Sequence, residues 1–245
     1  MAGHSKWANI KHRKAAQDAK RGKVFTKHIR EITVAAREGG GDVDSNAALR
    51  IAVDKALGVN MTRDTVERAI KRGTGDLEGV SYDDISYEGY APSGIAVLVE
   101  CSTDNKNRTV AEVRHAFSKY NGNMGTEGSV AYMFQKLGVI IMAEGVDEEQ
   151  TMDVVLDAGA EDIVTHEDGT VEVNCPATSY HDVIIALDKA ELKTESSEVL
   201  FRAENEIELN DADAEKVMKL VDALEDLDDV QEVYTNADFP ESVYS

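Results

Sequence analysis

The sequence has few of the residues that mark secreted, redox-active or membrane-spanning proteins. Its 245 residues include two cysteines, three prolines and one tryptophan, and no apolar run reaches the ~18 residues of a membrane span. Cys101 and Cys175 form no CxxC pair, so neither a disulfide framework nor a thiolate metal site is indicated. The N-terminus is basic but has no apolar segment behind it, unlike a secretory signal. These absences predict a cytoplasmic protein whose cysteines are small buried hydrophobic residues.

Motifs of the common enzyme classes are also missing. The sequence has no HExxH, no GxSxG and no dinucleotide fingerprint after a predicted strand, and His4, His12 and His28 have no cysteine at metal-ligand spacing. The glycine-rich segment 121–128 lacks the Lys-Ser/Thr ending of a P-loop. Acidic pairs are frequent, but 47 Asp and Glu produce such pairs by chance. We therefore expect no catalytic centre, cofactor or defined metal site, and a hydrolase built on acidic clusters is the remaining enzyme alternative.

Positive charge is scarce and unevenly placed. The formal net charge is −21, yet residues 1–72 hold 16 basic and 8 acidic groups and are net +8. Residues 73–136 are net −4 and residues 137–245 are net −25. The first 37 residues alone hold ten Lys or Arg and only two acids. So basic a segment in so acidic a protein predicts contact with a polyanion at the N-terminal end, while the acidic remainder repels phosphate.

The expected contacts in this basic arm are its cations and its aromatic residue. Lysine and arginine side chains bind phosphates and release counterions, and a tryptophan with few apolar neighbours can stack on a base. The alternatives are a solvated tail for the whole arm and, for the tryptophan, an anchor on the helices that follow. The predicted nucleic-acid-binding residues of the arm are Lys6, Trp7, Lys11, His12, Arg13, Lys14, Lys20, Arg21, Lys23, Lys27 and Arg30.

A second, smaller basic patch lies on a helix predicted over residues 105–120. This helix holds four of the ten basic residues that follow position 72. Its start offers free backbone N–H groups, which favour anions. We expect a second nucleic-acid contact from Lys106, Arg108 and Arg114. The alternative is an ordinary solvated helix face beside a mobile loop.

Hydrophobic spacing predicts three short helices within residues 24–72. Apolar residues recur at helical spacing from Phe25 to Ala36, and the glycines at 39–41 end that first helix. Ser45 is the expected N-cap of the second helix, and Thr62 or Asp64 that of the third. The arm and these helices form the expected first domain, residues 1–75.

After residue 75 the hydrophobic period changes from helical to alternating. Residues 94–134 predict a βαβ unit that ends in a strand at 128–134, and residues 205–235 predict another. Between them, residues 138–202 predict βαββαβ, the ferredoxin-like order. Joining the outer pieces gives a discontinuous ferredoxin-like α+β domain, residues 76–135 plus 204–245, with an acidic one, 136–203, inserted. The alternative is two separate three-element pieces packed on a central domain.

Three stretches of the sequence resemble the YebC/PmpR family, and the resemblance spans nearly the whole chain: MAGHSKWANIKHRKAAQDAKRGKVFTKHIREITVAAREGGGD, YEGYAPSGIAVLVECSTDNKNRTVAEVRHAFSKYNGNMGTEGSVAYMF and LEDLDDVQEVYTNADFP. It implies a three-domain, YebC-like α+β fold and a cytoplasmic, probable transcriptional regulator that binds DNA. It also implies kinship with mitochondrial translational activators and with bacterial proteins linked to ribosomes stalled on proline-rich stretches. Thr62 stands where the family generally has proline, and Ala91 and Ser93 replace glycines around Pro92. These departures concern local helix-start and loop geometry.

The sequence therefore predicts a non-catalytic regulatory protein that binds nucleic acid, without a membrane partner. The first alternative is a DNA-binding regulator of transcription, and the second is a ribosome-associated translation factor that binds ribosomal RNA. The third predicted helix has no Asn or Gln to read adenine, which favours low sequence specificity. Its basic residues are Arg63, Arg68, Lys71 and Arg72.

Overall fold

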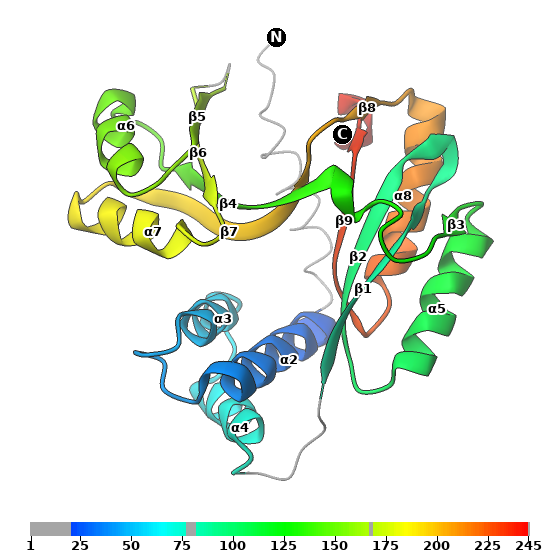
Figure 1. The fold of residues 1–245 in the computed structure, drawn as a ribbon, viewed down its shortest axis with the longest axis horizontal. Coiled ribbons are helices and arrows are strands. Elements are labelled where there is room, and N and C mark those ends of the chain that lie inside the picture. The colour runs from blue at the N-terminus through cyan, green and yellow to red at the C-terminus, as the bar shows by residue number, and fades with distance from the viewer. Residues whose placement is uncertain (1–20, 77–81, 167–168, 245) are drawn as a thin grey trace. The chain divides into compact units, whose positions relative to one another are not determined.

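The structure, a computed structural model, describes residues 21–76, 82–166 and 169–244 (Figure 1). It is an α+β protein in which three N-terminal helices precede two four-stranded sheets. Residues 133–205 pack as one compact unit, and the described residues up to 132 pack with residues 206–243 as a second. The α+β class expected from the sequence is thus confirmed, while the individual domain boundaries stay a prediction. Within the described ranges, no helix has the length and apolar character of a membrane span.

The helical bundle consists of α2 (Arg21–Gly39), α3 (Ala47–Gly58) and α4 (Arg63–Thr74) around its own apolar core. The N-cap of α3 is Asn46, whose side chain accepts from the Leu49 N–H at 3.0 Å. The expected Ser45 cap is wrong by one residue, because the Ser45 hydroxyl donates instead to the Asp42 carboxylate at 2.9 Å. Of the two residues expected to cap α4, Thr62 is the N-cap. Thr62 accepts from the Thr65 N–H, and Gly75 ends the helix in the left-handed conformation.

Gly73 allows α4 to lie directly against α2. A Cβ at this position would sit 2.4 Å from the Thr33 carbonyl oxygen and 2.7 Å from the Ala36 Cβ. The Thr33 hydroxyl also donates to the Ala69 carbonyl oxygen at 3.3 Å. Close packing and a hydrogen bond therefore fix α4 relative to α2, the helix that continues the basic arm.

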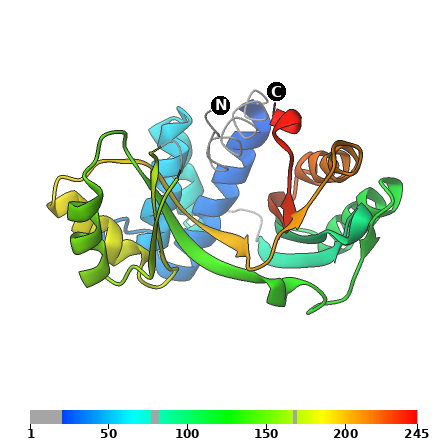
Figure 2. The same ribbon diagram turned by 90° about the horizontal axis from the view of Figure 1, so that it is seen from above.

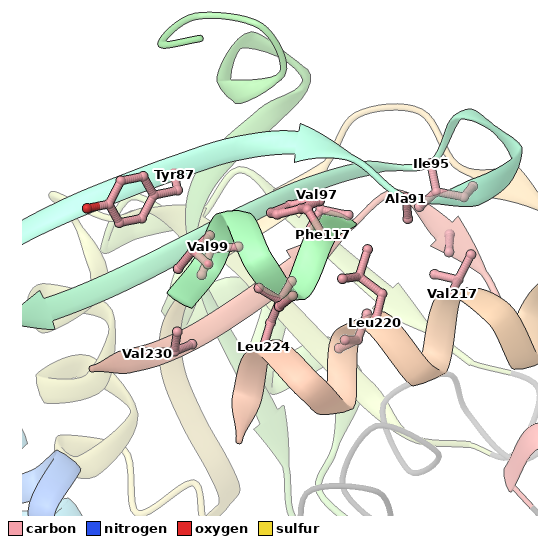
Figure 3. Packing of buried hydrophobic residues seen from close by; sticks show 14 of the residues in the cluster. Tyr87, Ala91, Ile95, Val97, Val99, Phe117, Val217, Leu220, Leu224 and Val230 are labelled. Atoms are coloured by element: carbon pink, nitrogen blue, oxygen red, sulfur yellow. The ribbon is translucent and has the colours of Figure 1, made fainter. Parts of the chain in front are cut away.

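The first sheet has the strand order β3 (Asn123–Met124), β1 (Asp83–Tyr90), β2 (Ala96–Thr103), β9 (Val230–Thr235), with every pair antiparallel. Two helices, α5 (Lys106–Lys119) and α8 (Asp211–Glu225), pack on it. Phe117, Leu220 and Leu224 from the helices meet Val97 and Val99 of β2 in one core (Figure 3). The short strands β8 (Ile207–Glu208) and β10 (Ala237–Asp238) pair in parallel beside this sheet. Three 3-10 turns, η1 (Pro92–Gly94), η2 (Ala131–Met133) and η3 (Glu241–Tyr244), complete the described elements.

The strand expected at residues 128–134 is wrong. This segment is a turn followed by η2, and strand β4 starts at Phe134. The buried carboxylate of Glu88 accepts the backbone N–H groups of Gly128, Val130 and Ala131 at 2.6–2.7 Å. Donors bound to a carboxylate cannot join a strand ladder. Apart from the 3-10 turns, the element order is therefore β1, β2, α5, β3 before the inserted unit and β8, α8, β9, β10 after it.

The inserted unit contains the expected βαββαβ order: β4 (Phe134–Met142), α6 (Glu148–Asp157), β5 (Asp162–Thr165), β6 (Val171–Pro176), α7 (Tyr180–Lys189) and β7 (Thr194–Ala203). Its antiparallel sheet has the order β5-β6-β4-β7. Figure 2 shows α6 and α7 on the same side of this sheet. The ferredoxin-like prediction is confirmed for this unit, although β4 and β7 each begin four residues earlier than expected.

Candidate nucleic-acid interface

The predicted arm residues divide at the start of α2. Arg21 and Lys23 belong to the first turn of α2, and Lys27 and Arg30 follow farther along the helix. The structure describes the side-chain contacts of Lys27 and Arg30. Outside the described residues lie Lys6, Trp7, Lys11, His12, Arg13, Lys14 and Lys20.

One basic face of α2 makes hydrogen bonds to the first sheet and to the segments beside it. The Lys27 ammonium donates to the Gln231 carbonyl oxygen at 3.1 Å, and the Arg37 guanidinium donates to the Tyr82 carbonyl oxygen. At 100° per residue, positions 27, 30 and 37 fall on the same side of the helix. Part of the positive charge that predicts phosphate binding is therefore used in intramolecular contacts.

Arg30 makes the most extensive of these contacts. It is only 7% exposed, and its Nη1 donates to the carbonyl oxygens of Ser102, at 3.1 Å, and of Asp228. Its Nη2 lies 3.0 Å from Asp229 Oδ1, and its guanidinium carbon lies 5.2 Å from the centroid of the Tyr82 ring. Arg30 was predicted to be a phosphate contact, but the structure places it inside the joint between α2 and the sheet.

Asp229 is the centre of this joint. Its side chain is 1% exposed, and Arg108 Nη2 lies 2.7 Å from its Oδ2, opposite the oxygen that Arg30 contacts. The hydroxyls of Thr103 and Thr109 also donate to Oδ2, at 3.0 and 2.7 Å. Arg30 and Arg108, which the sequence assigned to separate basic patches, thus meet on one carboxylate.

The electrostatics of Asp229 keep this carboxylate ionised. Burial alone raises its pKa, but hydrogen bonds from Arg108, Thr109 and Thr103 and the charge of Arg30 outweigh burial and hold the pKa below its ordinary value. At neutral pH the joint therefore contains two cations and a shared anion, and little of their charge is left for a ligand.

The basic patch on α5 is partly neutralised as well. Lys106 Nζ lies 3.4 Å from Asp83 Oδ2, with both side chains exposed, and Arg108 also pairs with Asp104 at 2.7 Å. Arg114 is exposed and forms no ion pair with any residue that the structure describes. Of the three predicted contacts on α5, Arg114 has the most available charge.

The third helix of the bundle, α4, presents cations that lie outside the predicted set of nucleic-acid-binding residues. Arg63, Lys71 and Arg72 are exposed and, among the described residues, have no acidic partner, whereas Arg68 pairs with Asp64. The opposite face of α4 lies in the bundle core. At 100° per residue Lys71 lies opposite the buried Val66 and Ala69, and Arg63 and Arg72 lie on either side of Lys71, so helical spacing is consistent with their exposure.

Reactive or metal-binding groups are not gathered in the described part of the chain. No group of three His, Cys, Asp or Glu side chains there could hold a metal ion. The closest approaches of this kind are two pairs, His28 Nδ1 with Glu31 Oε2 at 3.0 Å and His166 Nε2 with Glu172 Oε2 at 3.1 Å. Both cysteines are free thiols, and burial raises the pKa of Cys101 to about 12 and that of Cys175 to about 11. Neither thiol has the lowered pKa of a nucleophile.

Comparison with known proteins covers most of the chain. Residues 5–76 match the family described as "TACO1/YebC protein N-terminal domain", and residues 82–237 match "TACO1/YebC second and third domain". A protein of Ralstonia nicotianae is 60% identical over 237 residues, covering 97% of this chain and 98% of its own. One of Shewanella oneidensis is 60% identical over 243 residues, covering 99% and 98%. Both are named probable transcriptional regulatory proteins.

A solved structure is similar over nearly the same length. It is the crystal structure of a conserved hypothetical protein from Aquifex aeolicus, 41% identical to this chain. The match covers 91% of this chain and 92% of that chain, with a TM-score of 0.80. Sequence and fold thus agree on one family.

Proposed function

This chain belongs to the TACO1/YebC family, and from that premise we propose that it is a non-catalytic, nucleic-acid-binding regulator, in the first place a DNA-binding regulator of transcription in the cytoplasm. The names of the Ralstonia and Shewanella relatives support the regulatory role. The absence of enzyme motifs from the sequence agrees with it. Binding of DNA is our inference from the charge of the N-terminal part.

The observation that carries the proposal is the set of exposed cations on α4 that have no acidic partner among the described residues. Arg63, Lys71 and Arg72 are exposed on a helix that Gly73 holds tightly against α2. A rigid helix with unpaired cations, attached to the helix that continues the basic arm, can contact successive phosphates. The net charge of +8 over residues 1–72, against −25 over residues 137–245, directs a polyanion to this end of the chain.

We expect binding that depends on phosphate contacts and little on sequence. About five contacts would give a slope near −4.5 for log K against log salt on duplex DNA. Replacing Arg63, Lys71 and Arg72 together by Gln removes up to three contacts, so the slope should flatten by up to about 2.7. The matched control is Lys189→Gln with Lys193→Gln, two exposed lysines of the acidic unit, which should leave the slope unchanged.

Competition titrations at physiological salt test the proposal and its specificity. A promoter fragment should be preferred over random duplex by less than about tenfold, against roughly 10³-fold or more for dedicated repressors. A preference of 10³ or more would instead identify a sequence-specific repressor. A salt slope near zero for the intact protein would refute phosphate contacts as the basis of binding.

The second candidate is a ribosome-associated translation factor that binds ribosomal RNA. The observation that favours it is α4, which has no Asn or Gln to read adenine and has Asp64 in its first turn. A basic surface of this kind suits backbone and shape contacts with folded RNA. Co-sedimentation of the protein with ribosomes rather than with the nucleoid, together with crosslinks from Lys11, Lys14 or Lys23 to ribosomal RNA, would favour the translation factor over the DNA-binding regulator.

A further inference from the structure

The joint between the helical bundle and the first sheet is polar. The bundle and the sheet with its helices have separate apolar cores, which share no buried residue. The contacts that Lys27, Arg30 and Arg37 of α2 make with the sheet and the segments beside it are hydrogen bonds, one ion pair and the approach of Arg30 to the Tyr82 ring. Apolar burial is non-directional, whereas hydrogen bonds require particular distances and angles. Polar contacts of this kind can fix an orientation.

Of the three α2 residues, Arg30 contacts the largest number of segments around the first sheet. Its guanidinium reaches the end of β2 through the Ser102 carbonyl and the connection between α8 and β9 through Asp228 and Asp229. Asp229 is in turn held by the start of α5, through Arg108 and Thr109. One planar group with fixed donor directions therefore relates α2 to three elements of the sheet unit.

We propose that Arg30 and Asp229 are positioning residues that fix the bundle against the first sheet, and thereby fix the cations of α4 relative to the sheet and its helices when nucleic acid is bound. The identity of the ligand in this inference rests on the proposed function, whereas the fixed orientation of the bundle does not. Arg30 contacts no phosphate in this arrangement. It acts through the orientation of α2, to which α4 is tightly packed.

Burial separates this role from direct phosphate binding. Arg30 is 7% exposed and has acceptors for both terminal nitrogens, and the Asp229 side chain is 1% exposed. Arg108 supplies the matched comparison, because it binds the same carboxylate but belongs to the same sheet unit as Asp229. Loss of Arg108 leaves the link between α2 and the sheet in place.

The first test is a salt titration of duplex DNA binding by the full chain. Arg30→Gln should flatten the slope of log K against log salt by about 2 or more, because several contacts lose register, whereas loss of one direct contact flattens it by about 0.9. Asp229→Asn is the sharper variant. Removal of an anion should tighten binding by electrostatics alone, but loss of positioning should weaken it at least fivefold. Arg108→Gln should change the slope by no more than one contact.

The second test measures the geometry without nucleic acid. Spin labels at Glu67→Cys on α4 and Ser118→Cys on α5 are both exposed, while native Cys101 and Cys175 are buried and resist labelling. The distance distribution should be narrow in the otherwise unchanged protein and in Arg108→Gln, and broad in Arg30→Gln and Asp229→Asn. Arg30→Lys keeps the charge but not the fork of donors, so its distribution should also broaden.

The outcomes separate the two hypotheses. If the unchanged protein binds neither DNA nor RNA, the proposed function fails, and the label distances alone decide the positioning role. Narrow distributions in Arg30→Gln and Asp229→Asn, with thermal unfolding that confirms both are folded, would overturn that role. Tighter DNA binding by Asp229→Asn would overturn it as well. If Arg30→Gln or Asp229→Asn does not fold, Arg30→Lys takes its place, and a narrow distance distribution between the labels in Arg30→Lys would likewise overturn the positioning role.

Discussion

The helical bundle and the inserted unit each have an arginine paired with a buried carboxylate, but the two pairs connect different elements. Arg30 and Asp229, with side chains 8% and 1% exposed, connect α2 of the bundle to the first sheet. Arg202 and Glu172, 35% and 5% exposed and 2.6 Å apart, connect two strands of the single inserted sheet. The Arg30–Asp229 pair thus orients the helical bundle against the first sheet, whereas the Arg202–Glu172 pair supports one face of the inserted sheet.

The two regions also differ in the charge that they leave free. On α4 the exposed charged residues without an ion pair among the described residues are three cations, Arg63, Lys71 and Arg72, and one acid, Glu67. On α6 the exposed charged residues are all acidic: Glu148, Glu149, Asp153 and Asp157. Net charge along a sequence therefore locates a ligand surface only coarsely. Buried pairs such as Arg30 with Asp229 remove some cations from the available set, and exposed helix faces decide which remain.

The largest expected effect is on folding stability. Asp229→Ala leaves Arg30 buried without its anion, and loss of one partner of a buried pair costs about 3–5 kcal/mol. Glu172→Ala should cost about 1–2 kcal/mol, because the Arg202 side chain is a third exposed and can be hydrated. Urea unfolding of both variants measures the difference. Equal losses would contradict the distinction between the two pairs.

Acid titration adds an internal check on these two carboxylates. Burial raises the pKa of Glu172, but the hydrogen bond and charge of Arg202 outweigh it, so its pKa, like that of Asp229, lies below the ordinary value. Stability from a lowered carboxylate pKa is complete above the unfolded-state value of about 4 and is lost as pH falls through the folded value. Asp229→Asn should therefore show a smaller loss of unfolding free energy in acid than the unchanged protein.

The second effect concerns binding. Deletion of residues 1–20 removes five of the predicted cations and Trp7, and should weaken duplex DNA binding by at least about 100-fold near 0.1 M salt, because each contact contributes through counterion release. Fluorescence anisotropy measures the loss. The full chain with the single change Trp7→Ala keeps every Lys and Arg of the arm. If this variant binds as tightly as the unchanged protein, the effect of the deletion is due to charge rather than to stacking. An affinity unchanged by the deletion would move the interface entirely to α4 and α5.

The third effect compares two close approaches. Gly73→Ala should cost about 2 kcal/mol, since the new Cβ meets a backbone carbonyl oxygen 2.4 Å away. In the inserted unit, Gly138→Ala should cost about 1 kcal/mol, because its Cβ meets the side chains of Tyr180 and Cys175, which can shift more readily. Gly58→Ala at the end of α3 meets no atom within 4 Å and serves as the neutral control. Thermal unfolding of the three variants ranks them.

Local signals allowed much of this fold to be predicted from the sequence. The Thr62 cap and the Gly75 stop of α4 act over a few residues, and the βαββαβ order of the inserted unit follows from alternating and helical periods. The strand expected at 128–134 failed because Glu88, 40 or more residues earlier, captures its backbone N–H groups. Sequence periodicity carries no information about such a partner.

The candidate interface was less predictable for the same reason. Arg30 and Arg108 are residues of the type that binds phosphate, but their partners in the structure are distant in the sequence. The Ser102 carbonyl lies 72 positions from Arg30, and Asp229 lies 121 positions from Arg108. No local pattern distinguishes a cation that faces a ligand from one that faces a distant carboxylate. In contrast, the exposure of Arg63, Lys71 and Arg72 depends only on the helical spacing of α4 around the buried Val66 and Ala69, which is a local pattern.

The smallest expected effect tests whether the acidic unit acts on binding at a distance. Replacing Glu148, Glu149, Asp153 and Asp157 by their amides removes four exposed negative charges of α6. At 0.1 M salt the screening length is about 10 Å, so exposed charges influence only phosphates that pass close to them. We therefore expect DNA affinity to rise by less than about threefold, with a salt slope equal to that of the unchanged protein. Anisotropy titrations at two salt concentrations measure both quantities. A tenfold or larger gain that disappears at high salt would mean that α6 lies beside the bound nucleic acid, and the acidic unit would then have to be treated as part of the interface.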